Sequence, residues 1–407
     1  MNEINWYSAL DASKSDIARY ARSVIGPLDK RIRVNTSDGQ KILPSSSQIT
    51  NIYHLGNHLT NIPIVKRLFS DPGIVVLHET NLIDLARACS NEITGFDWYE
   101  QLVFYYGAEA RLLERKSTSD LDASDLLSQL FPLFQPFLKN AKAVIVHSQF
   151  AKTKVQEFFD GPVEFLPLSY LPEANIERDR SPVFPIQLIF CGHVGGNRRL
   201  IPFLKAWSEI SNPSLIRFNL YGHLPVDSEF FGAVDKFGLA DWVEHHGFVT
   251  DEVLAGAISN ADLAVNLRWP TMGESSGSLL RYWNHGITAV VTNTGSYKEL
   301  DESTVFKVSK NDENTELILL LERFIIAPEI LRSRGLAGRA FLLSHHAPER
   351  YIDGLLKVIK MQCNSVFIEE SLYHTPLDIC VDLLPNGSAE LLQNAAQIIT
   401  TTLGNSK

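Results

Sequence analysis

The sequence predicts an α/β protein built from two doubly wound parallel sheets. Short β-branched or aromatic runs alternate with longer helical patterns from the N-terminus to about residue 310. A polar segment at 171–185, which holds three prolines, interrupts this alternation as a linker would. The length of 407 residues exceeds what one hydrophobic core usually fills. We therefore expect two Rossmann-like domains, each with helices on both faces of its sheet, that face a central cleft.

The first half contains six candidate strands rich in β-branched and aromatic residues. They are residues 4–10, 30–36, 51–56, 73–79, 141–148 and 162–169. Helical patterns separate most of them, at 15–28, 61–69, 81–90 and 122–140. This order is the βαβ pattern of a parallel sheet. We assign residues 1–172 to an N-terminal Rossmann-like domain.

A second alternating series follows the linker, which we place at 173–185. Its candidate strands are residues 186–194, 216–224, 242–249, 262–268, 287–295 and 304–310. Its helical patterns include 200–210, 251–261 and 276–286. Residues 186–345 are therefore predicted to form a C-terminal Rossmann-like domain. In such sheets the ligand lies at the carboxyl ends of the strands.

The end of the chain is predicted to be helical. Apolar residues recur at helical spacing in ELILLLERFIIA and ERYIDGLLKVIK, between about residues 314 and 361. The tail contains another amphipathic candidate, SAELLQNAAQIITTTL. We assign residues 346–407 to C-terminal helices and a tail. Packing across the first domain and assembly with another chain both fit the spacing of the tail.

Composition limits the classes of function. The formal net charge of −10 argues against a broad nucleic-acid footprint, so an anionic ligand requires a local basic site. No segment approaches the ~20 apolar residues that span a bilayer, and MNEINWYSALDASKSD lacks the basic and apolar regions of a signal peptide. We expect a cytoplasmic protein, at most peripheral at the inner face of the membrane. The four cysteines lie far apart, as reduced thiols do: Cys89, Cys191, Cys363 and Cys380.

The stretch LIFCGHVGGNRRLIPFLKAW, residues 188–207, is the first candidate for anion binding. An apolar strand ends in a glycine-bearing turn that opens into a helix. Free backbone N–H groups, together with Arg198 and Arg199, can converge there on one phosphate. The alternative is a flexible turn with two solvated arginines. Neither a Walker A motif nor G-x-G-x-x-G is present.

A second strand-to-helix junction, NLRWPTMGESSGSLLRYW, repeats this logic. Pro270 and Gly273 indicate a turn, and the residues from Ser275 to Gly277 would expose N–H groups at a helix start. Glu274 has two readings. Its carboxylate either caps those amides or projects into the cleft beside a phosphate-binding helix end.

These motifs resemble the donor-binding half of the retaining glycosyltransferases of family 4, which have the GT-B fold. The likeness is carried by GHVGGNRRL, LYGHL, HHGFV and ADLAVNLRWPTMGESSGSLLRYWNHGITAVVTNTGSYKEL. In the same order, NWYSALDASKSDIARYA, IYHLGNH, VVLHETNL and VIVHSQFAKTKV resemble the acceptor half. The likeness covers most of the chain and ends at about residue 363. It implies that residues 1–172 bind the acceptor and residues 186–345 bind the donor.

The resemblance implies three catalytic residues. Glu274 matches the first glutamate of the E-x(7)-E motif, which lies near the transferred sugar. Arg198 matches the basic residue that neutralises the donor diphosphate. His78, in VVLHE, matches a histidine that faces the reaction centre. The alternative is a structural role, in which the histidine only caps the end of a strand.

The resemblance also implies binding residues for donor and acceptor. The donor set comprises Gly192, His193, Gly195, Gly196, Asn197, Arg199, Tyr221, Gly222, Phe248, Val249, Arg268, Ser275, Ser276, Gly277 and Arg281. Within it, Tyr221, Gly222, Phe248 and Val249 would line the pocket for the base. The acceptor set comprises Ser13, Asn57 and His147.

The sequence departs from the family pattern at two places. Arg281 stands in place of the second glutamate, one residue early, where the family binds the ribose hydroxyls of the donor. Because a guanidinium only donates hydrogen bonds, a deoxythymidine diphosphate sugar such as dTDP-rhamnose becomes the first candidate donor, with UDP- and GDP-sugars next. The N-terminal loop has the sequence ASKSD where the family often has glycines. Without glycine, side chains hinder a close approach of this backbone to the phosphate.

The resemblance thus implies a retaining, metal-independent hexosyltransferase that uses a nucleotide diphosphate sugar as co-substrate and no cofactor. Its acceptor would be a hydroxyl of a glycan or lipid-linked acceptor in polysaccharide or glycoconjugate biosynthesis. Two alternatives stay open: a GT-B-fold nucleotide-sugar epimerase or hydrolase, and a non-catalytic partner subunit of a glycosyltransferase. The D-x-D pair Asp120 and Asp122 reads as a solvated helix cap, and the sequence leaves the oligomeric state open.

Overall fold

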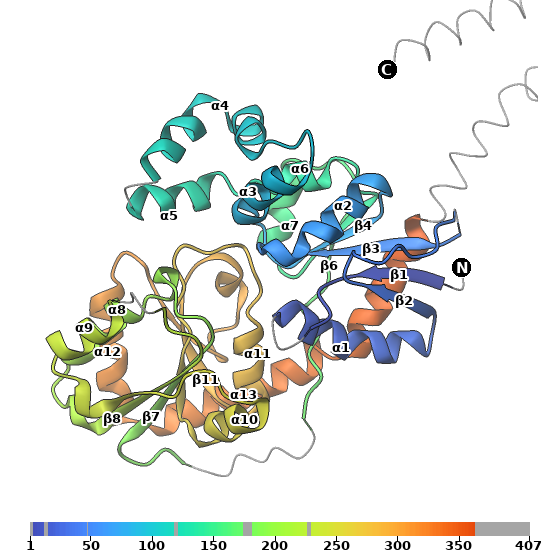
Figure 1. Cartoon of the computed structure of the whole chain (residues 1–407). Coiled ribbons are helices and arrows are strands. Elements are labelled where there is room, and N and C mark those ends of the chain that lie inside the picture. The colour runs from blue at the N-terminus through green and yellow to red at the C-terminus, as the bar shows by residue number, and fades with distance from the viewer. Residues whose placement is uncertain are drawn as a thin grey trace, which may run out of the picture. The chain divides into compact units, whose positions relative to one another are not determined.

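The computed structural model describes residues 3–11, 15–46, 48–117, 121–173, 181–225 and 229–362. They form two six-stranded sheets in which every strand pair is parallel, with helices against them (Figure 1). This arrangement confirms the predicted α/β class with two doubly wound sheets. In these ranges no helix combines the length and the apolar character that crossing a membrane requires.

The first sheet has the strand order β2-β1-β3-β4-β5-β6. Its strands are β1 (Glu3–Tyr7), β2 (Arg33–Ser37), β3 (Thr50–Leu55), β4 (Ile74–Leu77), β5 (Ala143–Val146) and β6 (Val163–Phe165). All six overlap the segments expected from the sequence. Every residue of β4 and β5 is buried, since helices cover both faces of a doubly wound sheet and the strands IVVL and AVIV carry no polar face.

The helices of the first half differ from expectation in two places. They are α1 (Asp16–Asp29), α2 (Ile62–Ser70), α3 (Ile83–Glu92), α4 (Trp98–Ser117), α5 (Leu121–Leu130), α6 (Gln135–Leu138) and α7 (Gln149–Gln156), with a 3₁₀ turn η1 at Leu59–Asn61. Helix α4 was not predicted. Leu102, Tyr106, Ala110 and Leu113 do face the core at helical spacing, but the exposed Phe104 and the non-helical backbone of Gly107 interrupt the pattern. The single helix expected over 122–140 is wrong: Pro132 and the left-handed Leu133 separate α5 from α6.

The second sheet has the order β12-β11-β10-β7-β8-β9. Its strands are β7 (Ile186–Cys191), β8 (Ile216–Tyr221), β9 (Val243–His245), β10 (Leu263–Val265), β11 (Thr288–Thr292) and β12 (Phe306–Val308). Its helices are α8 (Leu200–Ser208), α9 (Phe230–Lys236), α10 (Asp251–Asn260), α11 (Gly277–Asn284), α12 (Glu313–Ile326) and α13 (Glu329–His345). Short 3₁₀ turns are η2 (Gly196–Arg198), η3 (Pro213–Leu215), η4 (Ala240–Trp242) and η5 (Gly295–Glu299). The strand order reverses between β7 and β10, which is where such sheets bind ligands.

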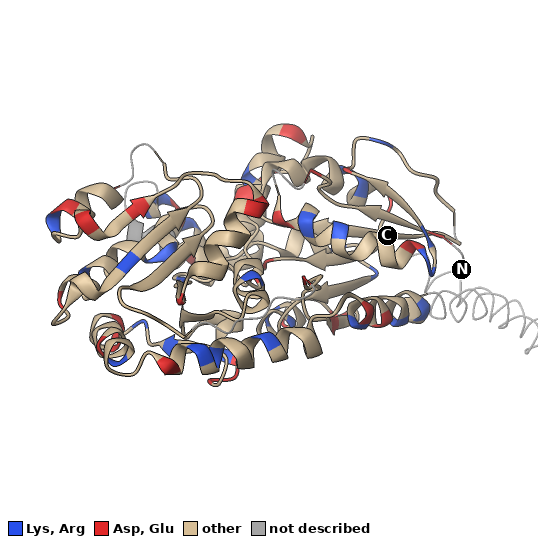
Figure 2. Ribbon diagram, turned by 90° about the horizontal axis from the view of Figure 1, so that it is seen from below, with Lys and Arg blue, Asp and Glu red and all other residues tan. Residues whose placement is uncertain are grey.

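Each sheet has its own hydrophobic core. One cluster joins the strands of the first sheet to its helices through Val75, Val144 and Phe137. The other centres on Phe203, Trp207 and Phe218 between α8 and β8. Acidic and basic side chains are interspersed along the helices around these cores (Figure 2). The two cores explain why a chain of this length folds as two sheets rather than one.

Residues 3–356 belong to one compact unit, whose last helical residues are 348–356. The ring of Tyr351 lies 5.5 Å from that of Tyr20 in α1, and Asp353 forms an ion pair with Arg31 at 2.6 Å. The predicted C-terminal segment thus returns to the first half before residue 357. The tail helix expected over 388–403 lies outside the described residues, and the predicted domain boundaries stay predictions.

Candidate functional site

The two loops that the sequence singled out meet at the switch point of the second sheet. One loop follows β7 and the other follows β10, and these two strands are neighbours. The backbone N–H of Trp269 donates to the carbonyl of Asn197 at 2.7 Å, which ties the loops together. Their free groups therefore face one region at the carboxyl edge of the sheet.

The loop after β7 depends on a close approach between two glycines. A Cβ atom on Gly222 would lie 1.9 Å from the carbonyl oxygen of Gly192, and both residues have positive φ. Further along, the backbone N–H groups of Gly195, Gly196 and Asn197 donate to no other described residue. The predicted donor-binding amides are thus available for an anion.

The two adjacent arginines differ in their surroundings. Arg198 ends η2 and forms no ion pair within the described ranges, although its guanidinium lies in electrostatic range of Glu79 and Tyr297. Arg199 has a left-handed backbone, φ 56°, and pairs with the buried carboxylate of Glu313 at 2.6 Å. Arg198 therefore has an uncommitted positive charge, whereas that of Arg199 is largely neutralised.

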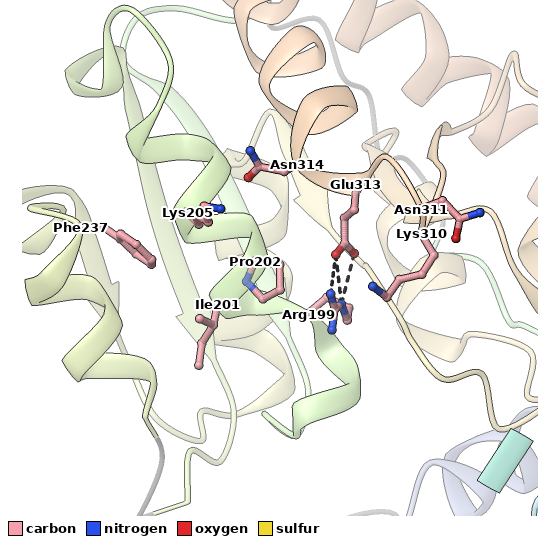
Figure 3. Close-up of a pocket in the computed structure, with 9 residues that line it drawn as sticks. All are labelled: Arg199, Ile201, Pro202, Lys205, Phe237, Lys310, Asn311, Glu313 and Asn314. Carbon is pink, nitrogen blue, oxygen red and sulfur yellow. Dashed lines mark hydrogen bonds and ion pairs between the residues drawn. The ribbon is translucent and has the colours of Figure 1, made fainter. Parts of the chain in front are cut away.

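Arg199 also borders a surface pocket of about 350 Å³ that sequence analysis did not anticipate (Figure 3). The pocket lies between the first turns of α8 and α12. Its lining residues are Arg199, Ile201, Pro202, Lys205, Phe237, Lys310, Asn311, Glu313 and Asn314. Of the predicted site residues this pocket contains Arg199 alone, so we do not place the chemistry there.

Glu274 is turned back into its own loop. Its Oε1 accepts a hydrogen bond from the guanidinium of Arg268, and its Oε2 accepts the N–H of Met272 at 2.7 Å. The hydroxyl of Thr271 donates more weakly, at 3.4 Å. The carboxylate does not cap Ser275 or the residues after it, and its role at the donor site stays a prediction. Arg268, a predicted donor-binding residue, is nearly buried beside it.

The start of α11 offers free amides. Ser276 caps the helix: its hydroxyl accepts the N–H of Leu279 at 3.2 Å. The N–H groups of Ser275, Gly277 and Ser278 have no acceptor within the part of the chain that the structure describes. Because these groups carry the positive end of the helix dipole, this helix start suits an anion.

The same turn is attached to the first half of the chain. The carbonyl of Met272 accepts the N–H groups of Thr80 and Asn81 at 2.9 and 3.0 Å. The hydroxyl of Ser275 donates to the carbonyl of His147 at 2.8 Å. These bonds bring the predicted donor loop beside His147, a predicted acceptor residue.

Arg281 is not directed at an open space. Its guanidinium pairs with Asp251, the first residue of α10, at 3.3 Å, and Arg19 of α1 pairs with the same carboxylate at 3.1 Å. One residue further on, the buried Tyr282 accepts the N–H of Cys191 at the end of β7, at 2.9 Å. Arg281, which stands in place of the second glutamate, and its neighbour Tyr282 thus both bind other parts of the protein.

The residues predicted to line the base pocket lie at the ends of β8 and β9. The ring of Tyr221 stacks on His246 with centroids 4.4 Å apart, and Gly222 follows it. Phe248 is 77% exposed, and Val249 lies next to it. The rings of His193 and His223 are stacked nearby, with centroids 5.8 Å apart. An exposed phenylalanine and stacked rings at the ends of these two strands are compatible with base binding.

In the first half, three histidines gather at the carboxyl ends of adjacent strands. Nδ1 of His54, in β3, lies 3.1 Å from Nε2 of His78, after β4. The ring of His147, after β5, lies 4.9 Å from that of His78. Trp6 and Tyr20 pack against His54 and enclose the cluster. His78, predicted to be catalytic, and His147, predicted to bind the acceptor, thus lie together, whereas His54 was not singled out by the sequence.

Burial keeps these histidines neutral. It lowers the pKa of His147 to about 4 and those of His54 and His78 well below the ordinary value, with the neighbouring rings adding to the effect. Nε2 of His54 and Nε2 of His147 are buried without a hydrogen-bond partner in the described ranges. These two nitrogen atoms are candidates for hydrogen bonds to a ligand or to water.

Glu79 is a candidate that sequence reasoning missed. It follows His78 at the end of β4, and its Oε1 accepts the backbone N–H of Asn57 at 2.7 Å. Burial raises the pKa of Glu79 to about 7, against the opposing effects of that hydrogen bond and of Arg198. Its signal was the polar pair that ends the strand run GIVVLHE. The side chain of Asn57, a predicted acceptor residue, donates to Asp84 at 3.0 Å.

Ser13, the D-x-D pair, a metal site and the cysteines are the other features that the sequence raised. Ser13 and Asp120 lie outside the described residues, as does the side chain of Asp122. Within the described ranges, no three His, Cys, Asp or Glu side chains are grouped so as to hold a metal ion. Cys89 and Cys191 are buried free thiols.

The sequence matches no protein-family model, and no curated protein matches it. The fold, in contrast, is similar to solved structures. Sucrose-phosphate synthase from Thermosynechococcus elongatus has 14% identity and a TM-score of 0.58, over 90% of this chain and 100% of its own. HepE from Anabaena in complex with UDP has 11% identity and a TM-score of 0.56, over 89% of this chain and 100% of its own.

A third similar structure is the pneumococcal O-GlcNAc transferase GtfA in complex with UDP and GlcNAc. It has 10% identity and a TM-score of 0.53, over 77% of this chain and 57% of its own, so the match spans little more than half of that enzyme. At these identities the likeness concerns the fold. The chain has the GT-B fold, in agreement with the expectation from sequence.

Proposed function

We propose that the protein is a glycosyltransferase that moves a sugar from a nucleotide diphosphate sugar to a hydroxyl acceptor. The observation that carries this proposal is the set of free amides at the linked loops after β7 and β10, with Arg198 beside them. Such a set suits a diphosphate, whose negative charge grows as the sugar–phosphate bond breaks. The UDP bound in structures of the same fold is in keeping with such a ligand.

The reaction needs little beyond electrostatic stabilisation and positioning. Arg198 and the amides at Ser275 and Gly277 would stabilise the departing diphosphate, and one well-placed donor of this kind is worth roughly 3 kcal/mol of barrier. We propose that these groups act without a metal ion and that transfer retains configuration. The buried histidines at the ends of β3, β4 and β5 would border the acceptor.

Glu274 belongs to this proposal as an indirect participant. In its present geometry the carboxylate holds Arg268 and the N–H of Met272. It therefore shapes the turn that presents the amides of α11, and it would orient the sugar once Arg268 turns to the donor. A hydrogen bond between a carboxylate and a guanidinium is strong, so this exchange requires the charge of the diphosphate.

The residue at position 281 bears on which nucleotide the donor sugar carries. Arg281 in place of a ribose-binding carboxylate favours a dTDP-sugar such as dTDP-rhamnose, because a guanidinium cannot accept a hydrogen bond from a hydroxyl. Its pairing with Asp251 occupies part of that guanidinium, and UDP is bound in two of the similar structures. We therefore propose a dTDP- or UDP-sugar, with a glycan or a lipid-linked glycan as acceptor.

The test is a panel of nucleotide sugars with a readout of nucleoside diphosphate release. UDP-glucose, UDP-GlcNAc, GDP-mannose and dTDP-rhamnose are incubated with the protein, with and without oligosaccharide acceptors. We expect release that depends on an acceptor, and a gain in unfolding free energy of about 2.7 kcal/mol at 100 times the dissociation constant of the nucleotide. Arg281→Glu should shift turnover toward the UDP-sugar, and an unchanged ratio would remove the argument from Arg281.

The same panel separates the alternatives. Release that does not require an acceptor would indicate a nucleotide-sugar hydrolase, and conversion of the sugar without release would indicate an epimerase. No release and no change of melting temperature with any nucleotide would contradict the enzyme proposal. A non-catalytic partner subunit would then be the better reading.

A further inference from the structure

We propose that Glu299 is a positioning residue for the transfer reaction. Its carboxylate fastens the first half of the chain to the second, so that the groups around His147 face the turn that carries Glu274. This role rests on the glycosyltransferase function proposed above and deepens it. Glu299 ends η5, the 3₁₀ turn that follows β11, and the family resemblance did not single it out.

The carboxylate of Glu299 binds the first turn of α7, in the first half of the chain. Oε2 accepts the backbone N–H of Gln149 at 3.0 Å, and Oε1 accepts that of Phe150. Ser148, the N-cap of α7, accepts the N–H of Ala151 at 3.1 Å. The first amides of a helix lack partners inside the helix and carry the positive end of its dipole, so they favour a carboxylate. Both oxygens of Glu299 thus form charge-assisted bonds to the other half of the chain.

Helix α7 begins directly after Ser148, which follows the predicted acceptor residue His147. The carbonyl of His147 accepts the hydroxyl of Ser275 at 2.8 Å, and its ring lies 4.9 Å from that of His78. The second half of the chain therefore holds this segment at two places. Ser275 binds the carbonyl of His147, and Glu299 binds the amides two and three residues later. These bonds fix where the histidines lie relative to the start of α11.

On the other side, η5 is attached to the turn that carries Glu274. The hydroxyl of Ser296 donates to the carbonyl of Glu274 at 2.8 Å. A Cβ atom on Gly295 would lie 2.5 Å from Oγ1 of Thr271, so η5 and this turn are in close contact. One short element thus binds the proposed sugar-orienting turn through its first residues and the predicted acceptor half through its last.

The side chain of Glu299 is exposed, so its two bonds lie at the surface and outside both hydrophobic cores. Their loss should leave the packing of each sheet intact. The proposed diphosphate groups all belong to the second half of the chain, and nucleotide binding should therefore persist as well. The step that needs donor and acceptor together should be slowed. A residue that served only the fold would instead change the melting temperature.

The test compares the wild type with Glu299→Gln, using UDP-glucose and dTDP-rhamnose as donors and the oligosaccharide acceptors of the panel. Glutamine offers one accepting oxygen in place of two and carries no charge. We expect kcat to fall about tenfold, the difference that a hydrogen bond to a charged group makes. We expect the dissociation constants of UDP and dTDP to stay within about twofold and the melting temperature to be nearly unchanged.

Asp301→Asn is the matched control. Asp301 lies two residues after Glu299, and its carboxylate accepts the N–H of Ser303 at 2.7 Å, inside its own turn. We expect wild-type turnover in this variant. A loss equal to that of Glu299→Gln would contradict the proposal, because the missing negative charge alone would then explain both results.

Gln149→Pro removes the same contact from the side of α7. Gln149 is the first residue of the helix, its side chain is exposed, and proline is favoured at this position. Ser148 before it is already extended, as a residue before proline has to be. We expect a loss of kcat in the same direction as in Glu299→Gln. In the double variant the two losses should not multiply, because both substitutions break one contact.

The outcomes separate this role from the proposed function. A Glu299→Gln variant that binds UDP or dTDP and keeps kcat within twofold would overturn the role of Glu299 alone. The same holds if kcat falls only together with the melting temperature and the affinity for the nucleotide. A wild type that neither binds nor turns over any nucleotide sugar would overturn the proposed function and this role with it.

Discussion

Arg198 and Arg199 are adjacent in sequence, but they meet different surroundings. Arg199 immediately precedes α8 and reaches Glu313, a residue 114 positions away, with three hydrogen bonds to its carboxylate. Arg198 closes the preceding 3₁₀ turn and has no ion-pair partner in the described part of the chain. A free cation beside exposed amides favours anion binding, whereas a buried pair contributes mainly to the fold.

This difference predicts separate effects of two alanine substitutions. Arg198→Ala should reduce kcat at least ~100-fold and leave the melting temperature nearly unchanged, because it removes charge stabilisation of the leaving diphosphate. Arg199→Ala should lower the free energy of unfolding by about 3 kcal/mol, because it leaves Glu313 buried and unpaired. Thermal melts and nucleoside diphosphate release on both variants provide the measurements.

Equal losses of turnover in the two variants would contradict this division. They would return Arg199 to the donor site, where the sequence resemblance placed it. Arg198→Lys is a useful third variant, since lysine keeps the charge but not the planar fork of the guanidinium.

At the scale of elements, the turn between β10 and α11 combines two functions. It exposes the amides of α11, and it joins the first half of the chain through Met272 and Thr80. Gly273 makes this contact possible: its φ is +74°, and a Cβ atom there would lie 1.9 Å from Oγ1 of Thr80. A glycine is therefore required both by the backbone conformation and by the space.

Gly273→Ala should destabilise the protein by more than about 1 kcal/mol and reduce turnover, because the turn must move away from Thr80. Gly256→Ala in α10 is the matched control. Gly256 lies inside a helix with no atom near its missing Cβ, so alanine there should stabilise by up to about 1 kcal/mol. Denaturant titrations of both variants measure the effect. A Gly273→Ala protein as stable as the wild type would show that the turn is not held against Thr80.

At the scale of the whole molecule, a buried polar cluster joins segments that lie far apart in the sequence. The rings of Tyr20 in α1, His78 after β4, His147 after β5 and Tyr351 near the C-terminal end of the first compact unit are in contact. His346 lies near it, with Nδ1 2.8 Å from the carbonyl of Leu168. Burial lowers the pKa of each of the histidines involved.

The cluster predicts a loss of stability in mild acid. Above pH 6.5 these histidines are neutral in both states, so the folded protein has its full stability. Below pH 6.5 these histidines become protonated in the unfolded chain. In the folded protein His147 and His346 stay neutral until about pH 4, because burial lowers their pKa. Between pH 6.5 and pH 4, each of these histidines therefore lowers the free energy of unfolding by about 1.4 kcal/mol for every pH unit of acidification. Glu79 acts in the opposite direction: because its pKa is raised, the folded protein binds one proton there before the unfolded chain does, which adds stability as the pH falls.

Melting temperatures between pH 8 and pH 5 test this prediction. We expect a steady decrease below pH 6.5 in the wild type and a smaller decrease in His147→Asn. Asparagine can still donate a hydrogen bond to the carbonyl of Leu166, which Nδ1 of His147 contacts at 2.9 Å, but it does not titrate. A wild type whose melting temperature is constant from pH 7 to pH 5 would contradict the prediction.

The sequence by itself determined the order and the class of the elements. Apolar runs such as GIVVLHE and AKAVIVHS identified buried strands, and glycines identified the turns at 192–196 and 273, since local chemistry restricts these choices. It also located the two loops that we propose bind the diphosphate. Helix α4 escaped because the non-helical Gly107 interrupts its apolar pattern, and the break between α5 and α6 was missed although Pro132 marks it.

Only the tertiary structure decided which charged groups are available. Glu274 meets Arg268, Arg199 meets Glu313 and Arg281 meets Asp251. Glu79 emerged for the same reason, since its pKa depends on burial and on Arg198 from the other half of the chain. A charged side chain is neutralised or activated by its neighbours in space, and the sequence does not show which neighbours those are.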